Sequence, residues 1–236
     1  MIRKKSLILR WKTNGMVMKR LFLLWVLVSV ALCGWGQTYV VRMETNRGVI
    51  RMELSDLTPL HRDNFVKNVR EGFYDGLLFH RVIANFMVQA GDQTTREKGV
   101  KRKAVEHYTV PAEFHVPELF CCRGAVAMAR EDAAQNPELA SSGHQFFIVW
   151  GKQWSERQVR KYHARTLEQT GKEVVADSAM VNAYWEVGGT PYLDGTYTVF
   201  GKVIEGLDVV DAIQQSATDE GQKPLEDVRI VRAEVE

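Results

Sequence analysis

The sequence predicts a mainly β domain, an antiparallel barrel that is closed on itself and capped at its ends by two helices. Two observations indicate this class. Many short segments alternate between apolar and polar residues, as strands with one buried face do. Only two framework helices accompany them, and so many strands with so few helices favour a sheet that closes into a barrel. The length of 236 residues suffices for one such domain with an insert.

A hairpin and a helix are predicted at the start of the barrel. Residues 39–54 alternate on both sides of an NRG turn, and two such segments around a Gly-containing turn are typical of a β-hairpin. A helix is then expected to begin at Thr58-Pro59, with Thr58 as its N-cap and Pro59 at its first position. Its apolar stripe ends before Gly72, a residue type that is common just past helix ends.

The second half of the chain supplies the remaining framework. The segment GLDVVDAIQQSA places its apolar residues on one face of a helix over 206–217. The final segment, VRIVRAEV, alternates as a strand does. Further strands are predicted, from their apolar and β-branched residues, over 77–90, 124–128, 145–150 and 196–204.

Residues from about 152 to 188 interrupt this pattern and predict a helical insert. The stretch is rich in Glu, Gln, Lys, Arg and Ala. Ser155 and Gln158 fit a capping box at its start. Gly171 divides the insert in two, and Asp177 is expected to cap the second helix.

The N-terminus predicts an export signal over residues 1–36, which leaves 37–236 as the mature domain. A Lys-Arg pair precedes LFLLWVLVSVAL, a mostly apolar run of twelve residues. Gly34 and Gly36 then supply small residues at positions −3 and −1 of a cut before Gln37. A basic start, a short apolar run and small residues before the cut are the features of a secretory signal peptide.

The signal has a possible upstream extension, because Met16 or Met18 also fits as the start. The apolar run is too short for a comfortable membrane span, so we expect an exported, periplasmic protein with no stable span after cleavage. Two alternatives stay open. One is an uncleaved anchor, and the other is a lipid anchor through Cys33, although the preceding Leu32 is bulkier than the residue before a lipid-modified cysteine usually is.

The basic balance of the chain belongs to this N-terminus. Residues 1–36 hold seven Lys/Arg and no acidic residue, which leaves 24 basic and 29 acidic residues in the remainder. The mature domain is therefore net acidic, and its charge gives no reason to expect nucleic acid binding.

Two cysteines remain after the cut, Cys121 and Cys122. Adjacent cysteines rarely bridge each other because the ring they would close is strained. We therefore expect thiols and no internal disulfide, with a vicinal redox pair as the alternative.

The sequence lacks the motifs of several well-known catalytic, metal and nucleotide-binding sites. HExxH, paired CxxC, GxSxG and GxxxxGK[ST] are absent, and the six histidines lack metal-ligand spacing. We expect no metal and no cofactor. Ser141, Ser142 and His144 lie close in sequence and leave a serine-hydrolase site as an alternative.

One stretch points to a different kind of site. FHRVIANFMVQAGD (79–92) sets Arg81 among apolar residues, although a protein core has no use for a lone guanidinium. We interpret it as a shallow apolar pocket with one fixed cation. Each aromatic residue on a strand, taken alone, is as well explained by the core, but aromatic and amide residues cluster in three places: Phe86, Met87 and Gln89; Gln145, Phe146 and Phe147; Tyr192, Leu193 and Tyr197.

These segments resemble a known family. FHRVIANFMVQAGD, GAVAMAR, SSGHQFFIVWG and LDGTYTVFGKVIEGLDVVDAI stand in the order found in cyclophilin-type peptidyl-prolyl cis/trans isomerases, and the chain is similar to their exported bacterial members. The resemblance covers about residues 38–235 except for the insert. It implies an eight-stranded antiparallel barrel capped by two helices, and acceleration of rotation about X–Pro bonds (EC 5.2.1.8). Bond rotation requires neither metal nor redox chemistry, so no cofactor is implied.

The resemblance also implies roles for individual residues. Arg81 resembles the catalytic arginine and Gln89 the amide that holds the substrate backbone. The backbone of Ala129 and Arg130 is expected to pair with an extended peptide. The remaining expected substrate-binding residues are the proline-pocket walls Phe86, Met87, Phe147 and Leu193, the groove residue Gln145, and Tyr192 and Tyr197, which replace a tryptophan and a histidine of the family.

The implied partners are proline-containing segments of exported polypeptides, bound by a monomer that assists folding. Two other classes of function stay open: a non-catalytic proline-peptide binding module or chaperone, and an unrelated barrel hydrolase. The insert has two possible roles. It is either a helical flap packed on the barrel, or a rim that selects client chains or a partner.

Overall fold

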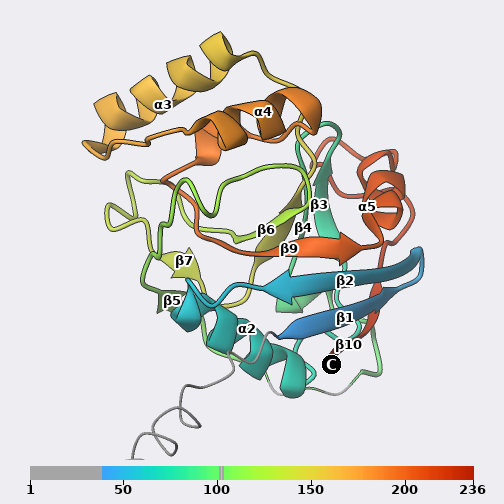
Figure 1. The fold of residues 1–236 in the computed structure, drawn as a ribbon. Helices are drawn as coiled ribbons and strands as arrows, with labels where there is room; N and C mark the ends of the chain where they lie inside the picture. The colour runs from blue at the N-terminus through green and yellow to red at the C-terminus, as the bar shows by residue number, and fades with distance from the viewer. Residues whose placement is uncertain (1–38, 101, 103) are drawn as a thin grey trace, which may run out of the picture. The chain divides into compact units, whose positions relative to one another are not determined.

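Eight strands of the described chain pair into one antiparallel sheet (Figure 1). The computed structural model describes residues 39–236 except 101 and 103, so the predicted signal over 1–36 and Cys33 lie outside the described residues. The order across the sheet is β10-β1-β2-β9-β6-β8-β4-β3. The bounds are β1 (Val40–Thr45), β2 (Gly48–Leu54), β3 (Phe79–Ile83), β4 (Met87–Ala90), β6 (Ala125–Met128), β8 (Phe146–Val149), β9 (Val199–Glu205) and β10 (Ile230–Val235).

The two outer strands of this order, β10 and β3, meet and close the curled sheet. Leu78 and Arg229 form an antiparallel bridge between them. Backbone bonds from Phe79 N to Val228 O (2.9 Å) and from Ile230 N to Leu77 O (2.8 Å) flank the bridge. The predicted closed barrel is confirmed, with closure made by this short bridge.

Strand alternation divides the side chains between two clusters. On β4, β8 and β6, one set of alternate residues faces the main core, with Val88, Phe146 and Val126 among its members. The other set forms a second cluster on the outer face, with Met87 and Phe147 among its members. Because successive side chains of a strand point to opposite faces, three strands build both the interior of the barrel and an apolar outer face.

Two helices pack on the barrel as framework elements: α2 (Pro59–Arg70) against β10 and β9, and α5 (Leu207–Gln214) against β2, β4 and β3. Phe65 of α2 enters the core, where its ring lies 4.9 Å from Tyr74, 5.0 Å from Phe200 and 5.2 Å from Phe146. The two predicted capping helices are thus present. The ring contacts of Phe65 bury a large apolar surface of α2 in the barrel.

Two local predictions are confirmed only in part. Residues 77–90 form two strands, β3 and β4, because Asn85 takes a positive φ of 58° and turns the chain between them. Thr58 stands at the N-cap of α2 but its side chain makes no capping bond. The Glu113 carboxylate accepts instead from Leu60 N (3.2 Å) and His61 N (3.0 Å), so the cap comes from a distant loop.

The insert folds as two helices, as predicted: α3 (Glu156–Thr170) and α4 (Ser178–Glu186), which lie side by side on one side of the barrel (Figure 1). Gly171 ends α3 with φ 68°, and the Asp177 side chain accepts from Met180 N at 2.8 Å to cap α4. The short helix η2 (Pro191–Leu193) follows the insert and contacts α3. None of the helices among the described residues is long and apolar enough to cross a membrane.

Three short elements complete the described part of the chain. They are η1 (Gln93–Thr95) and a two-stranded sheet of β5 (Thr109–Val110) with β7 (Ser141–Ser142). This small sheet is not among the elements predicted from the sequence.

Cys121 and Cys122 are free, in agreement with the expectation that they do not bridge. Burial raises the pKa of both thiols, that of Cys122 to about 11. The thiolate is the reactive form of cysteine, so a raised pKa speaks against the alternative of a vicinal redox pair.

We expect the free energy of unfolding to fall as the pH drops from 7.5 to 5.5. Burial lowers the pKa of His61, His80 and His144, so these rings take up protons more readily after unfolding. Below about pH 6.5 the unfolded chain binds more protons than the folded chain, and stability is lost in that window. The loss is at most about 1.4 kcal/mol per histidine and pH unit. Urea unfolding at three pH values measures it.

His144→Phe is the matched variant for this measurement. The ring of His144 stacks on Phe73 at 4.6 Å and its Nε2 has no partner among the described residues, so phenylalanine keeps the packing and removes the titration. Its stability should depend less on pH than that of the wild type. An unchanged slope would contradict a contribution from His144.

Candidate functional site

A row of residues crosses four neighbouring strands on the outer face of the barrel. Arg81 on β3 pairs with Gln89 on β4, Gln89 pairs with Phe147 on β8, and Phe147 pairs with Ala127 on β6. Cross-strand partners point to the same face, so the row sets a cation, an amide and an aromatic ring side by side. Segments that are far apart in sequence thus meet through strand register.

A β-bulge aims Arg81 into this row. The register shifts between Phe79 and Arg81, so that one residue more stands on β3 than on β4. Phe79 and Val82 both belong to the main core. Regular alternation from Phe79 would turn Arg81 inward as well, but the bulge re-aims it outward, as bulges beside functional sites often do.

Three glutamines hold the Arg81 guanidinium in a chain of hydrogen bonds. Arg81 Nε donates to Gln222 Oε1 at 2.8 Å, and Nη1 donates to Gln89 Oε1 at 3.3 Å. Gln89 Nε2 in turn donates to Gln145 Oε1 at 2.9 Å. Gln222, which lies in the loop before β10, is not among the site residues predicted from the sequence. A backbone bond from Val82 N to Gln222 O at 2.8 Å fixes that loop against β3.

Arg81 lies at the edge of an apolar pocket of about 120 Å³. Met87, Phe147 and Leu193 are almost fully buried beneath it. Nine of the eleven predicted site residues come together here. The lining residues are Arg81, Phe86, Met87, Gln89, Ala129, Arg130, Phe147, Leu193 and Tyr197.

Tyr197 and Arg130 form one side of the pocket together. The ring of Tyr197 lies edge-on to that of Phe147, with 5.7 Å between the ring centroids. The Arg130 guanidinium lies over the Tyr197 ring, 4.3 Å from its centroid. Arg130 Nε also donates to Thr196 O at 2.7 Å. The Arg130 side chain therefore steadies Tyr197 by a cation–π contact.

The backbone expected to pair with an extended peptide is only partly free. Ala129 N donates to Gln145 O and Ala129 O accepts from Ser142 N, each at 2.8 Å. The amide and carbonyl of Arg130 bond to none of the described residues. Ala129 thus lines the pocket, and Arg130 is the residue whose backbone can pair with a ligand.

Two predicted residues lie outside the pocket. Gln145 lines an adjoining groove of about 380 Å³ together with Gln89, Ala129 and Arg130. Tyr192 packs behind the pocket wall. Its ring lies 5.9 Å from Phe86, 5.4 Å from Tyr162 and 6.1 Å from Trp154, so it joins Phe86 to the insert.

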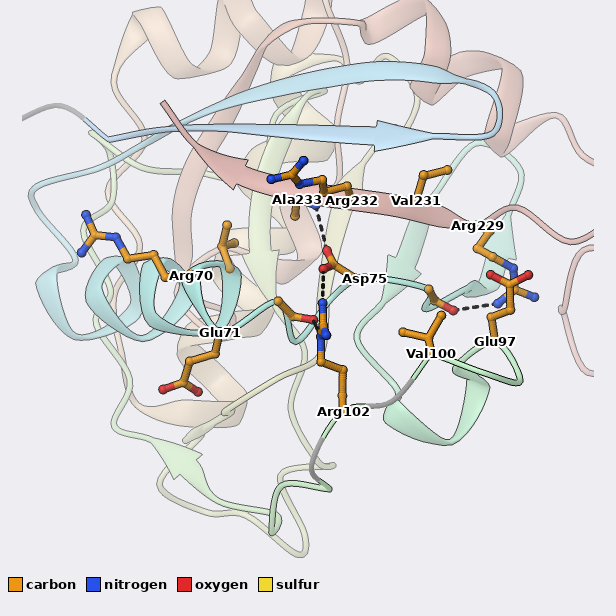
Figure 2. A pocket seen from close by; sticks show the side chains of 13 residues that line it. Arg70, Glu71, Asp75, Glu97, Val100, Arg102, Arg229, Val231, Arg232 and Ala233 are labelled. Carbon is orange, nitrogen blue, oxygen red and sulfur yellow. Dashed lines mark hydrogen bonds and ion pairs between the residues drawn. The ribbon is translucent and has the colours of Figure 1, made fainter.

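A larger pocket, of about 680 Å³, lies beside the end of α2 and β10 (Figure 2). Two of its arginines already bond within the protein. Arg102 Nη2 contacts Asp75 Oδ2 at 2.9 Å, and Arg229 Nη1 donates to Gly76 O at 2.7 Å. Because these charges neutralise or cap neighbouring groups, volume alone does not mark this pocket as the functional site.

The structure does not support a serine-hydrolase site made of Ser141, Ser142 and His144. His144 does not meet Ser141. Instead, His61 Nε2 lies 2.9 Å from Ser141 Oγ, and His61 Nδ1 lies 2.6 Å from Glu113 Oε2. This Ser–His–Glu order matches that of a nucleophile with its base. However, His61 is 0% and Ser141 1% exposed, so a substrate cannot reach the hydroxyl, and Glu113 is already the cap of α2.

Comparison with known proteins identifies relatives. The family model described as "Cyclophilin type peptidyl-prolyl cis-trans isomerase/CLD" matches residues 40–235. A Staphylococcus epidermidis protein that carries the name of a peptidyl-prolyl cis-trans isomerase is 36% identical over 197 residues, which cover 83% of this chain and 91% of that protein. A protein of the same name from Staphylococcus aureus is 35% identical over 206 residues, covering 85% and 93%.

Solved structures show the same fold. A crystal structure of a cyclophilin-type peptidyl-prolyl cis-trans isomerase from Cryptosporidium parvum matches with a TM-score of 0.60 at 24% identity, covering 84% of this chain and 98% of that chain. A second structure of that protein, in the presence of the dipeptide Ala-Pro, matches with a TM-score of 0.58.

We expect Ser141→Ala to lower the free energy of unfolding by about 1–2 kcal/mol, because it leaves buried His61 Nε2 without its partner. Chemical denaturation measures this loss, and exposed Ser178→Ala is the control. We also expect a fluorophosphonate probe for reactive serines not to label the native protein. Labelling at Ser141 would contradict a purely structural role.

Proposed function

This chain belongs to the cyclophilin-type peptidyl-prolyl cis-trans isomerases, and we propose that it acts on proline-containing segments of exported polypeptides. Its reaction is rotation about the bond that precedes proline. The observation that carries the assignment of the site is the placement of Arg81 beside the pocket. Gln222 and Gln89 bond to its guanidinium, and Gln145 in turn bonds to Gln89.

The reaction needs no bond to be made or broken. The X–Pro bond has partial double-bond character, with a rotation barrier of roughly 18–20 kcal/mol. Its cis and trans forms differ by only about 0.5–1 kcal/mol, so both occur and exchange slowly. The transition state is a twisted amide. Twisting ends conjugation and leaves a localised lone pair on the prolyl nitrogen.

We assign Arg81 as the donor to that lone pair. Its Nε and Nη1 bond to Gln222 and Gln89, whereas Nη2 bonds to none of the described residues. An N–H aimed at the prolyl nitrogen bonds the twisted form but finds no lone pair in either planar form. Only an interaction that is stronger in the transition state accelerates a reaction. Arginine suits this role because it keeps its charge and holds its donors in a rigid fork.

The apolar wall and the polar groups of the site contact opposite sides of the X–Pro bond. Met87, Phe147 and Leu193 offer a surface for the proline ring. Gln89 and the Arg130 backbone can hold the chain on the other side of the bond, so one side turns against the other. Apolar surroundings lower the local dielectric, which strengthens the effect of the guanidinium.

Proline peptides are the proposed ligands. The Cryptosporidium relative was solved in the presence of Ala-Pro, and that likeness supports a proline dipeptide as the smallest ligand to test here. A non-catalytic binding module would hold the same ligand without turning it over. We propose that the protein acts as a monomer.

NMR exchange spectroscopy on a short Xaa-Pro peptide, with catalytic amounts of the protein, tests the isomerase assignment. Cross-peaks between the cis and trans resonances should appear at mixing times at which the free peptide shows none. If the peptide binds, as seen by shifts in its resonances, without exchange cross-peaks, the protein is a binding module.

The location is a separate proposal. The basic start, apolar run and small residues of the N-terminus support export and cleavage before Gln37, which would place the mature protein in the periplasm. Expression of the full chain, cell fractionation and mass spectrometry of the N-terminus test this. A mature protein that begins at Gln37 is expected, whereas a lipid-modified Cys33 would indicate the alternative anchor.

We expect Arg81→Ala to keep the fold and to lower kcat/KM by about 100- to 1,000-fold, the usual cost of removing one donor from a transition state. A protease-coupled proline-peptide assay measures the rate. Arg81→Lys keeps the positive charge but lacks the planar set of guanidinium donors. Its kcat/KM should therefore lie between those of the wild type and Arg81→Ala. Near wild-type turnover in Arg81→Ala would refute the role.

We expect Gln222→Ala to lower kcat/KM by roughly 5- to 10-fold, because Arg81 Nε loses the acceptor that orients the guanidinium. The same assay, together with urea unfolding, measures rate and stability separately. Gln215→Ala is the matched control, since Gln215 is exposed and bonds only to Asp211. Equal rates for the two variants would show that Gln222 does not position Arg81.

A further inference from the structure

The turn that carries Leu193 contains a buried carboxylate whose partners come from the insert. Asp194 is 1% exposed. Its Oδ2 accepts from Tyr184 OH at 2.7 Å and lies 2.9 Å from His163 Nε2. Its Oδ1 accepts from Cys121 N at 2.8 Å. Two of the three donors therefore come from α4 and α3, the helices that interrupt the barrel sequence.

This carboxylate sits at the base of the proline-pocket wall. Leu193, the preceding residue, lines the pocket, and its carbonyl accepts from the amides of Thr196 and Tyr197, each at 3.1 Å. The turn thus connects Leu193 to Tyr197, which also lines the pocket. A shift of Asp194 would move both residues, because they share one tight turn with it.

Burial makes the donors necessary. A buried carboxylate is costly unless hydrogen bonds satisfy it, and the ion pairs in the described part of the chain give Asp194 no Lys or Arg partner. Burial also raises the pKa of Tyr184 well above its ordinary value, so its hydroxyl stays a donor at any working pH. Since a carboxylate only accepts, the proton in the His163 contact lies on Nε2.

Further contacts seat the insert on this turn and on the residues just before it. Val174 lies so close to Gly195 that a Cβ added there would approach it to 2.7 Å. Trp154 Nε1 donates to Gly189 O at 2.8 Å, and the ring of Tyr162 lies 5.4 Å from that of Tyr192. Tyr192 in turn contacts Phe86 of the pocket. The insert therefore backs the pocket wall at several points.

We propose that His163 and Tyr184 are positioning residues for the proline pocket, acting through Asp194 on Leu193 and Tyr197. The insert is then neither an independent flap nor only a rim, but a brace for one wall of the site. This inference rests on the proposed isomerase site. It also explains why two helices far from Arg81 in sequence carry buried polar groups that a simple flap would not need.

Tyr184→Phe is the first test, because it removes one hydroxyl and keeps the buried ring. We expect KM for a proline peptide to rise roughly three- to tenfold, which is less than the full effect of one lost hydrogen bond to a charged group, because the pocket wall is displaced and not removed. We expect kcat to stay within about twofold. The pocket wall contacts the proline ring equally in the planar and twisted states. A displaced wall therefore weakens binding of both states by the same amount, which raises KM and leaves kcat unchanged.

His163 offers a rescue test. Leucine at this position keeps the volume but cannot donate to Asp194, whereas the glutamine amide can replace Nε2 as the donor. We expect His163→Leu to raise KM like Tyr184→Phe, and His163→Gln to restore most of the wild-type value. A KM for His163→Gln as poor as that for His163→Leu would contradict donation to Asp194 as the cause.

Val159→Ala is the matched control. Val159 lies in the same insert and the same apolar cluster as Tyr184, but makes no bond to Asp194. It should destabilise the insert and leave KM near the wild-type value. If Val159→Ala raises KM as much as Tyr184→Phe does, general loosening of the insert explains the effect and the proposal fails.

Amide hydrogen exchange tests the brace independently of catalysis. In Tyr184→Phe, the amides of Cys121, Thr196 and Tyr197 should lose protection, whereas in Val159→Ala they should keep it. This result stands even if the wild type shows no turnover, which would overturn the isomerase assignment alone. A wild type that turns over, with unchanged KM and unchanged protection in Tyr184→Phe, would overturn the brace alone.

Discussion

The candidate site depends on one irregularity in the sheet, the β-bulge between Phe79 and Arg81. A regular strand would send Arg81 toward the same interior as Phe79. The bulge turns it to the outer face, where register sets it beside Gln89 and Phe147. Cation, amide and aromatic ring are then neighbours on a rigid sheet, which holds catalytic groups more accurately than a loop does.

Two segments distant in sequence hold the site residues that the sheet places side by side. Gln222, 141 residues from Arg81, accepts from its Nε and so orients the guanidinium. On the opposite side, the insert supplies His163 and Tyr184 to the buried Asp194 beneath the pocket wall. The pocket is thus held at both edges by polar contacts, and its floor by apolar packing. Such preorganisation matters because a misplaced donor loses most of its effect on a transition state.

Local patterns in the sequence were enough for much of the fold. The alternation of 39–54, the Gly after α2 and the caps of the insert helices each act over a few residues, and the structure agrees with them. The family resemblance supplied the residues that meet in the pocket. The bulge, Gln222 and the Glu113 cap could not be predicted, because each depends on contacts between segments that no local pattern records. Tyr192 stays a predicted substrate-binding residue, and its packing between Phe86 and the insert also depends on contacts between distant segments.

The central claim is that Arg81 donates to the prolyl nitrogen while the ring lies on Phe147 and Leu193. A crystal structure of the full domain with a bound Xaa-Pro peptide tests it most directly. The proline ring is expected in the 120 Å³ pocket, with Arg81 Nη2 within about 3–3.5 Å of the prolyl nitrogen. A proline ring seated in the adjoining groove, or a guanidinium turned away from that nitrogen, would contradict it.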